Sequence, residues 1–161
     1  MRALTIRQPW AWAVIHAGKT VENRSRNIAG AYRGLVAIHA SKRDDLSAFI
    51  ASNVLCEAVE RYLPRRTRGG LVDMREPWLL NHGMIIGVAD LVDVHYVDGH
   101  SERWDAEAER NTTCSPWAHH GPIWHLVFTN PRPLAHPIPA RGQLGLWTLP
   151  DDVEQAVRRR L

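Results

Sequence analysis

The stretch Leu4–Arg26, LTIRQPWAWAVIHAGKTVENRSR, constrains the fold of this chain more than any other. Its first five residues alternate and include β-branched side chains, which predicts a short strand. Gln8-Pro9 ends that strand, and proline is tolerated in the first turn of a helix. From Trp10 to Ala17 the apolar residues have helical spacing, so we expect a short helix that Gly18 ends in a left-handed conformation.

Charged side chains gather directly after this predicted helix, at Lys19, Glu22, Arg24 and Arg26. If residues 21–26 are extended, the last three of them share one face, because strand side chains alternate. The cluster has two interpretations. It is either a solvated surface strand whose charges neutralise one another, or a set of groups placed for binding or catalysis.

The same residues carry a resemblance to a known family. QPWAWAVIHAGKTVENR resembles the signature of the ASCH domain, a small β-barrel domain related to the PUA fold and implicated in RNA binding. The family motif is written G-x-K-x-x-E-x-R. Lys19, Glu22 and Arg24 fit its last three fixed positions, whereas Ala17 stands at the glycine position and Gly18 follows one residue later.

Two further stretches resemble the family in the same order along the chain. They are GLVAIHASK at Gly34–Lys42 and PIPARGQLGLW at Pro137–Trp147. The resemblance therefore covers roughly the whole chain, and it implies a PUA-like β-barrel.

Length and composition are those of one globular domain spanning residues 1–161. Two distant cysteines, Cys56 and Cys114, do not indicate a disulfide framework. The N-terminus lacks the pattern of a signal peptide, and no apolar run is long enough to cross a membrane, so we expect a cytoplasmic protein. The formal net charge of +3 is mild, although arginines cluster at 65–68 and 158–160.

The rest of the chain alternates short strands with a few helices. The pattern predicts strands at 35–40, 84–97, 122–128 and 145–149, and helices from 44 to about 63, from 101 to 110 and from 151 to 161. Residues 67–82 resemble a long surface connection. Gly87 indicates a bulge or a close backbone approach, and the proline-rich NPRPLAHPIP favours an edge strand or an irregular crossing.

These elements predict an α+β fold. Periodicity does not choose between a barrel and an open sheet, and the family resemblance implies the barrel. We therefore expect a PUA-like β-barrel of about five to six strands, with helices packed at its openings.

Metal and cofactor sites have little support in the sequence. Of the nine histidines, His119, His120 and His125 lie nearest to Cys114, but the chain has no Cys-x-x-Cys pair and no His-Glu-x-x-His helix. We expect His125 to be a core histidine or part of a cavity wall. Nucleophile elbows, phosphate-binding glycine loops and dinucleotide fingerprints are also absent from the sequence, so we expect neither a metal nor a cofactor.

Seven tryptophans are many for a chain of 161 residues. Single-stranded RNA is bound by stacking its bases on aromatic rings while basic groups contact the phosphates. We expect Trp10 to stand at a cleft, because it begins the helix beside Gln8, and Trp147 to line the barrel interior.

As a binding module, the protein would hold single-stranded RNA or a modified nucleoside or nucleotide. Lys19, Arg24 and Arg26 would then contact phosphate, and Gln8 or Asn23 would read a base edge. Ser41, at the end of the strand that holds His39, would open on the same cleft.

As an enzyme, the protein would be a hydrolase with Lys19, Glu22 and Arg24 as its catalytic residues. The resemblance implies two activities, because some family members cleave RNA without a nucleotide cofactor and others remove an acyl group from a modified cytidine. For metal-independent RNA cleavage, Glu22 would take a proton from a 2′-OH while Lys19 and Arg24 stabilise the phosphorane charge.

The acyl-removing amidohydrolases use the motif lysine, which corresponds to Lys19, with a threonine three positions later and a carboxylate on the strand after the long helix. Here Glu22 stands at the threonine position, and Asp90 is the nearest candidate for the carboxylate. The Lys–Glu–Arg set is equally compatible with a static ion-pair network that shapes a pocket.

Overall fold

The computed structural model describes residues 1–62, 81–98 and 114–161. Within these residues, six strands form one sheet in the order β2-β5-β4-β3-β1-β6. The strands are β1 (Arg2–Gln8), β2 (Val21–Arg24), β3 (Gly34–Asp44), β4 (Met84–Asp98), β5 (Pro122–Pro139) and β6 (Leu146–Thr148). The helices are α1 (Trp10–His16), α2 (Ala48–Ala51), α3 (Asn53–Tyr62) and α5 (Asp151–Arg158).

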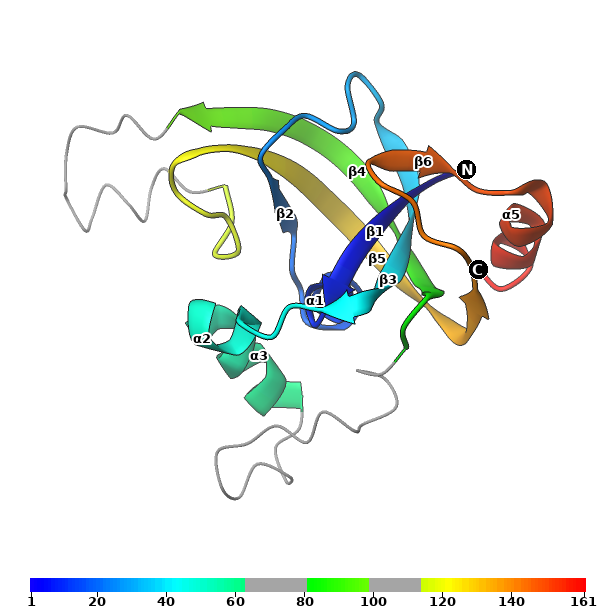
Figure 1. Ribbon diagram of the computed structural model, residues 1–161, viewed down its shortest axis with the longest axis horizontal. Coiled ribbons are helices and arrows are strands. Elements are labelled where there is room, and N and C mark those ends of the chain that lie inside the picture. Colours follow the sequence, from blue (N-terminus) through cyan, green and yellow to red (C-terminus); the bar gives the residue numbers. More distant parts are fainter. Residues whose placement is uncertain (63–80, 99–113) are drawn as a thin grey trace.

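The sheet curls into a half-barrel, which confirms the predicted α+β barrel class (Figure 1). Its longest pair is β4 with β5, whose antiparallel register shifts at Ile85/Gly87, Val88/Asp90 and Leu91/Asp93. Such irregularities increase strand twist and bend a sheet. Strand β1 pairs with β3 in parallel and with β6 antiparallel.

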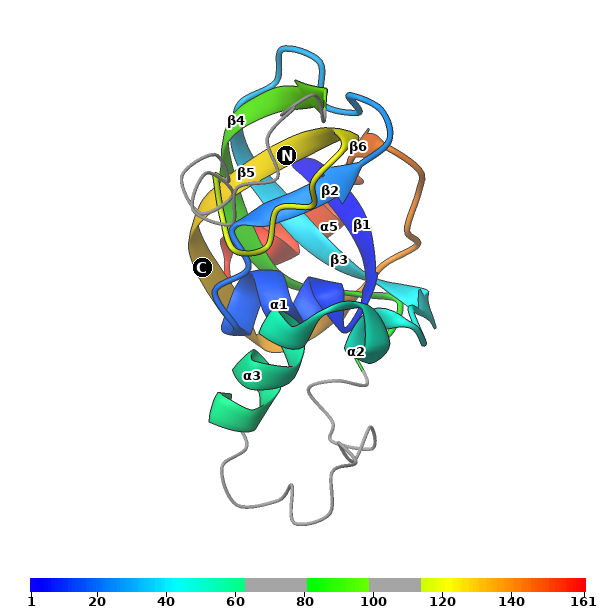
Figure 2. The same ribbon diagram turned by 90° about the vertical axis from the view of Figure 1, so that its left-hand side faces the viewer.

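Helix α1 lies across one open end of the curled sheet, with α2 and α3 beyond it (Figure 2). Its residues Ala11, Val14 and Ile15 join the core inside the sheet, while Trp12 and Ala13 pack with the buried face of α3. A helix that is apolar on all sides is expected to be buried in this way. The helix ends as predicted, with Gly18 at a φ of +70°.

The single long helix predicted from Asp44 is wrong. Strand β3 continues to Asp44, and a break at Ser52 separates α2 from α3, with extended backbone angles of −144° and 104° at that serine. The Ser52 hydroxyl accepts a hydrogen bond from the Leu55 backbone N–H, at 3.2 Å, so Ser52 starts a new helix instead of continuing the first.

The proline-rich segment 130–139 belongs to β5, so the predicted end of this strand at residue 128 is wrong. The edge position expected for the prolines is confirmed, because β2 covers only residues 124–127 of β5 and beyond them β5 pairs with β4 alone among the described strands. The remaining predicted strands match β3, β4 and β6 with small shifts of their ends, and the C-terminal helix is α5.

Two predicted segments fall on residues that the structure does not describe. The connection at 67–82 lies outside the described residues except for its last two positions, and the helix at 101–110 lies wholly outside them. Among the described helices, none has the length and apolar character that crossing a membrane requires.

Gly87 allows α1 and β5 to approach β4 closely, and replacing it tests this packing. A Cβ atom at Gly87 would lie 2.7 Å from the Arg132 carbonyl oxygen and 2.7 Å from Ile15 Cδ1. We expect Gly87→Ala to lower the free energy of unfolding by about 1–3 kcal/mol, because the clashing oxygen belongs to backbone. Urea denaturation measures the change.

Val92→Thr on the same strand is the matched control. Val92 is half exposed, and threonine is β-branched like the valine that it replaces. We expect this control to change the free energy of unfolding by less than about 0.5 kcal/mol. Equal stability of Gly87→Ala and the unchanged protein would contradict the close packing described above.

Candidate functional site

A cavity of about 680 Å³ lies where β2 and β1, from opposite parts of the sheet order, face each other. Its walls come from β1, the start of α1, residues 19–24, the end of β3 and residues 143–145. We call this cavity the seam cleft. It exists because the curled sheet brings β1 and β2 together without pairing them in one ladder.

An ion-pair network of Lys19, Glu22 and Arg24 lies in the wall of the seam cleft. Lys19 Nζ lies 3.0 Å from one carboxylate oxygen of Glu22, and an Arg24 guanidinium nitrogen lies 3.1 Å from the other. The Lys19 side chain is only 3% exposed, and its ammonium also donates to the Val21 carbonyl oxygen. The network thus pairs a charge that would otherwise be costly to bury.

Arg24 also connects the two facing strands. Its guanidinium donates a hydrogen bond of 3.0 Å to the Thr5 carbonyl oxygen on β1. The network therefore serves two purposes, because it neutralises Lys19 and ties β2 to β1 across the seam. Glu22 and Arg24 share one face of β2, as the alternation of strand side chains predicts. The strand ends at Arg24, so the predicted extension of this face to Arg26 is wrong.

Trp10 lines the cleft in a fixed orientation. Its indole N–H donates to an Asp45 carboxylate oxygen at 2.9 Å, and Lys19 Nζ lies 5.6 Å from its ring centroid. Hydrogen bonds from Ser47 and Trp10 lower the pKa of Asp45, so this carboxylate is a dependable acceptor at neutral pH. The aromatic ring is thus held from both its edge and its face.

Asn23 holds the segment 114–121 against the cleft. Its amide donates to the Trp117 carbonyl oxygen and accepts from the His119 backbone N–H, both at 2.9 Å. The Thr20 and Ser115 hydroxyls, 2.7 Å apart, add a second link to the same segment. Asn23 lines the cleft, but both ends of its amide are already engaged.

Of the other predicted binding residues, one lines the seam cleft and two do not. Ser41 lines the cleft, as Trp10 does. Gln8 is fully buried outside it, and its side-chain oxygen accepts a hydrogen bond from the Trp12 backbone N–H. Arg26 is exposed beyond the end of β2 and is not among the residues that line the cleft.

Among the residues of the seam cleft that sequence reasoning missed are two arginines and a histidine, Arg7, Arg43 and His119. Arg7 could have been predicted from the sequence, because it alternates with the buried residues of β1 and so faces away from them. Arg43 follows Ser41 at the end of the same strand. For His119 there was no local signal, since the bonds to Asn23 bring its segment to the cleft.

Besides Asp45, His119 is a titratable group of the cleft whose pKa is displaced. Burial, followed by the positive charge of Lys19, lowers the pKa of its imidazole below the usual value. The ring is therefore neutral near pH 7 and has a lone pair available to accept a proton.

A second hollow of about 860 Å³ adjoins the seam cleft. The two share five lining residues: Thr5, Ser41, Arg43, Gln143 and Leu144. The second hollow adds Lys42 and Arg141. The two hollows therefore lie next to each other at the end of β3.

Comparison with known proteins agrees with this fold. A family model described as the ASCH domain matches residues 4–135. A crystal structure of ASCH from Zymomonas mobilis has a TM-score of 0.52 and 14% identity to this chain, covering 98% of this chain and 93% of that one. Crystal structures of two single-residue variants of the Zymomonas mobilis protein match with the same score and identity, covering 98% and 99% of this chain and 96% of theirs.

A search of curated protein sequences gave no significant match. At 14% identity, the structural similarity supports the fold alone. The family model covers most of the chain and includes the Lys–Glu–Arg residues of the seam cleft. The chain therefore belongs to the ASCH domain family, whose fold is PUA-like.

Proposed function

We propose that the protein binds single-stranded RNA along the seam cleft and the adjoining hollow. The observation that carries this proposal is that the two hollows adjoin and share five lining residues, since a mononucleotide would need only one of them. A strand of a few nucleotides fits a depression that is lined by cations and contains a fixed aromatic ring.

The charges of the seam cleft favour an anionic ligand. Its lining holds four cationic side chains and two carboxylates. Both carboxylates already have partners, because Glu22 pairs with Lys19 and Arg24 and Asp45 accepts hydrogen bonds from Trp10 and Ser47. The exposed Arg7 and Arg43 form no ion pair within the described part of the chain, although the charge of Arg7 contributes to the lowered pKa of Asp45. Both guanidiniums can therefore contact phosphates.

Trp10 supplies the stacking surface. Its hydrogen bond to Asp45 and its contact with Lys19 fix the ring before any ligand arrives. Pre-organised aromatic side chains lose little conformational entropy on binding, and base stacking tolerates different sequences. Arg43 and Lys42 at the end of β3, together with Arg141, line the second hollow and would contact the RNA backbone there.

The geometry gives less support to the amidohydrolase alternative. That activity requires Lys19 as the catalytic group, but its nitrogen donates to both the Glu22 carboxylate and the Val21 carbonyl oxygen. Its nitrogen is thus engaged on two sides and is placed to stabilise negative charge. Asp90, the second candidate group, is paired with Arg132 and is not among the residues that line the seam cleft.

RNA cleavage is the second candidate function, and His119 is the residue that favours it. Both oxygens of Glu22 are paired with cations, so protonating this carboxylate would weaken two ion pairs. Neutral His119 faces no such cost and lines the same cleft. We therefore assign proton acceptance from the 2′-OH to His119, charge stabilisation to Lys19 and Arg24, and the positioning of these cations to Glu22.

Salt dependence tests the binding proposal. If three to five phosphates are neutralised, log affinity for a short single-stranded RNA should fall against log salt with a slope of roughly −2 to −3.5, at about −0.7 per contact. We expect Arg141→Ala to flatten this slope by about 0.7. Trp10→Ala should instead cost about 1–3 kcal/mol of stacking and leave the slope unchanged. Fluorescence anisotropy over a salt series measures both quantities.

Two variants serve as controls for the binding experiment. Trp10→Phe retains an aromatic ring and should keep most of the affinity, whereas Arg159→Ala removes an exposed arginine of the C-terminal cluster and should change nothing. An affinity for short RNA that does not vary with salt, or an equal effect of Arg159→Ala and Arg141→Ala, would refute the proposed path.

Single-turnover cleavage of the same RNA tests the second candidate. We expect His119→Gln to lower the rate on the order of 10²-fold or more while the affinity is retained, because the proton acceptor is lost but the cations remain. His120→Gln, at the neighbouring exposed histidine, should cleave at the unchanged rate.

Comparison with Glu22→Gln separates the two possible bases. Cleavage that survives His119→Gln but is lost in Glu22→Gln would assign the base to Glu22 and contradict our assignment. If the unchanged protein binds RNA without cleaving it, the catalytic candidate fails and the binding proposal stands.

A further inference from the structure

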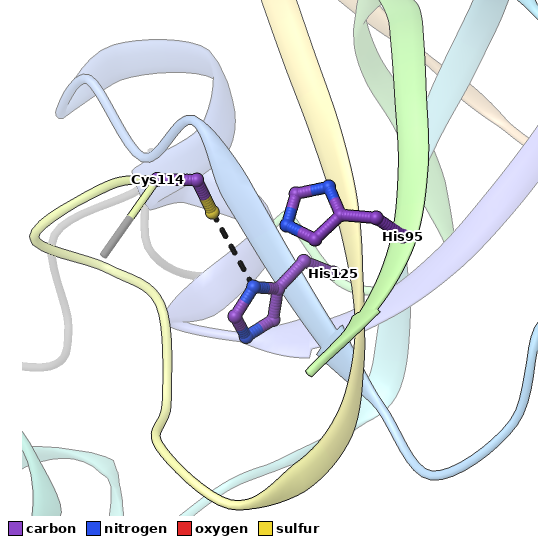
Figure 3. A group of neighbouring side chains, drawn as sticks. All are labelled: His95, Cys114 and His125. Atoms are coloured by element: carbon purple, nitrogen blue, oxygen red, sulfur yellow. Dashed lines mark hydrogen bonds between the residues drawn. The ribbon is translucent and has the colours of Figure 1, made fainter. Parts of the chain in front are cut away.

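Three potential metal ligands meet on the side of segment 114–121 that faces β4 and β5. They are His95 on β4, Cys114 at the start of the segment and His125 on β5 (Figure 3). One ligand atom from each lies within 4.8 Å of the others. Figure 3 shows the Cys114 sulfur and both imidazole rings turned toward one another.

The sheet register fixes two of these ligands. His95 and His125 are direct partners across the antiparallel β4–β5 pair, so their side chains project on the same face. Their ring centroids are 5.2 Å apart. Cys114 then approaches His125, with its sulfur 3.3 Å from Nδ1.

Each imidazole has one nitrogen engaged and the other facing the group. His125 Nε2 lies 2.9 Å from the His119 carbonyl oxygen, to which it can only donate, and this leaves Nδ1 as a lone-pair donor facing Cys114. His95 Nδ1 lies 2.6 Å from an Asp93 carboxylate oxygen, which leaves Nε2 facing the group. Metal-binding histidines are typically oriented by a carbonyl or carboxylate in this manner.

We infer that His95, Cys114 and His125 bind a divalent transition-metal cation, with Zn²⁺ the best match. Two imidazoles and a thiolate suit zinc and do not suit Mg²⁺ or Ca²⁺, which prefer oxygen. Bond lengths of about 2.0 Å to nitrogen and 2.3 Å to sulfur place tetrahedral ligand atoms roughly 3.3–3.6 Å apart. The separation between Cys114 Sγ and His125 Nδ1, 3.3 Å, is already close to the sulfur–nitrogen value, and His95 and Cys114 are not buried, so they can close the remaining gap.

A catalytic cysteine–histidine pair is the main alternative for these residues. A nucleophilic cysteine needs one histidine as its base, and such a pair leaves no role for the second imidazole, His95, which lies within 4.8 Å of the same sulfur. A metal, in contrast, replaces the thiol proton when it binds.

The expected consequence of metal binding is local order beside the seam cleft. The site would join β4, β5 and the beginning of segment 114–121, whose other side carries the backbone bonds to Asn23. The inference does not depend on the proposed RNA binding, and it is tested without RNA.

Cobalt substitution tests the proposed metal site. The full chain is treated with a chelator, kept reduced with a phosphine and then titrated with Co²⁺. Co²⁺ bound by a thiolate gives a sulfur-to-metal charge-transfer absorption, and tetrahedral coordination gives intense visible bands. We expect both signals to saturate at one Co²⁺ per chain and to be displaced by Zn²⁺. Cys114→Ser should abolish the charge-transfer absorption, and His95→Gln should weaken Co²⁺ binding at least about 10-fold.

The chain offers a matched control for each ligand type. Cys56→Ser changes the other cysteine, whose thiol donates to the Phe49 carbonyl oxygen, and His136→Gln changes an exposed histidine elsewhere on β5. Both should bind Co²⁺ as the unchanged chain does. Zn²⁺ should also raise the thermal unfolding midpoint of the unchanged chain but not that of Cys114→Ser.

Three outcomes would overturn the inference. They are the absence of a thiolate absorption in the unchanged chain, its persistence in Cys114→Ser, and its loss in Cys56→Ser. If Cys114→Ser does not fold by circular dichroism, unchanged Co²⁺ affinity in folded His95→Gln overturns the inference as well.

Discussion

The hydrogen bond from Arg24 to the Thr5 carbonyl oxygen is the contact on which the site depends. The curled sheet has β2 at one end of its strand order and β1 near the other, and no shared ladder joins them among the described strands. A long polar side chain bridges the gap instead. The space that the missing ladder leaves is the seam cleft, so the irregularity of the barrel and the position of the site have one cause.

The Lys–Glu–Arg motif has a structural explanation at each of its positions. Gly18 takes the left-handed conformation that ends α1, although the family motif places its glycine at the position of Ala17. Lys19 then turns into the protein and is neutralised by Glu22, and Glu22 holds Arg24 against β1. A buried ion pair is costly to form, but removing one partner is costlier still, because it leaves a buried charge without compensation.

Segment 114–121 lies between the two sites that we propose. On one side it presents His119 to the seam cleft and is held by Asn23. On the other side His125 donates to the carbonyl oxygen of the same His119 and faces Cys114. The backbone of His119 is therefore shared by the wall of the seam cleft and the proposed metal site. Metal binding on one side of the segment would restrain the wall of the cleft on the other side.

The sequence by itself determined the local elements and the charged cluster. Strand β1, helix α1, its end at Gly18 and the shared face of Glu22 and Arg24 all follow from periodicity and turn chemistry, which act within a few residues. At Gly87 the sequence predicted a bulge or a close backbone approach, and the structure has the close approach beside a register shift. The helix break at Ser52 was missed, because a single serine cap outweighed a long apolar pattern.

Only the tertiary structure decided which distant residues meet. The burial of Gln8, the exclusion of Arg26 from the cleft, and the arrival of Arg7, Arg43 and His119 depend on how far the sheet curls. His95 and His125 become neighbours only through the β4–β5 register, which shifts three times along the pair. A register set by bulges and long-range packing leaves no periodic trace in the sequence, and this is why the metal ligands could not be grouped from it.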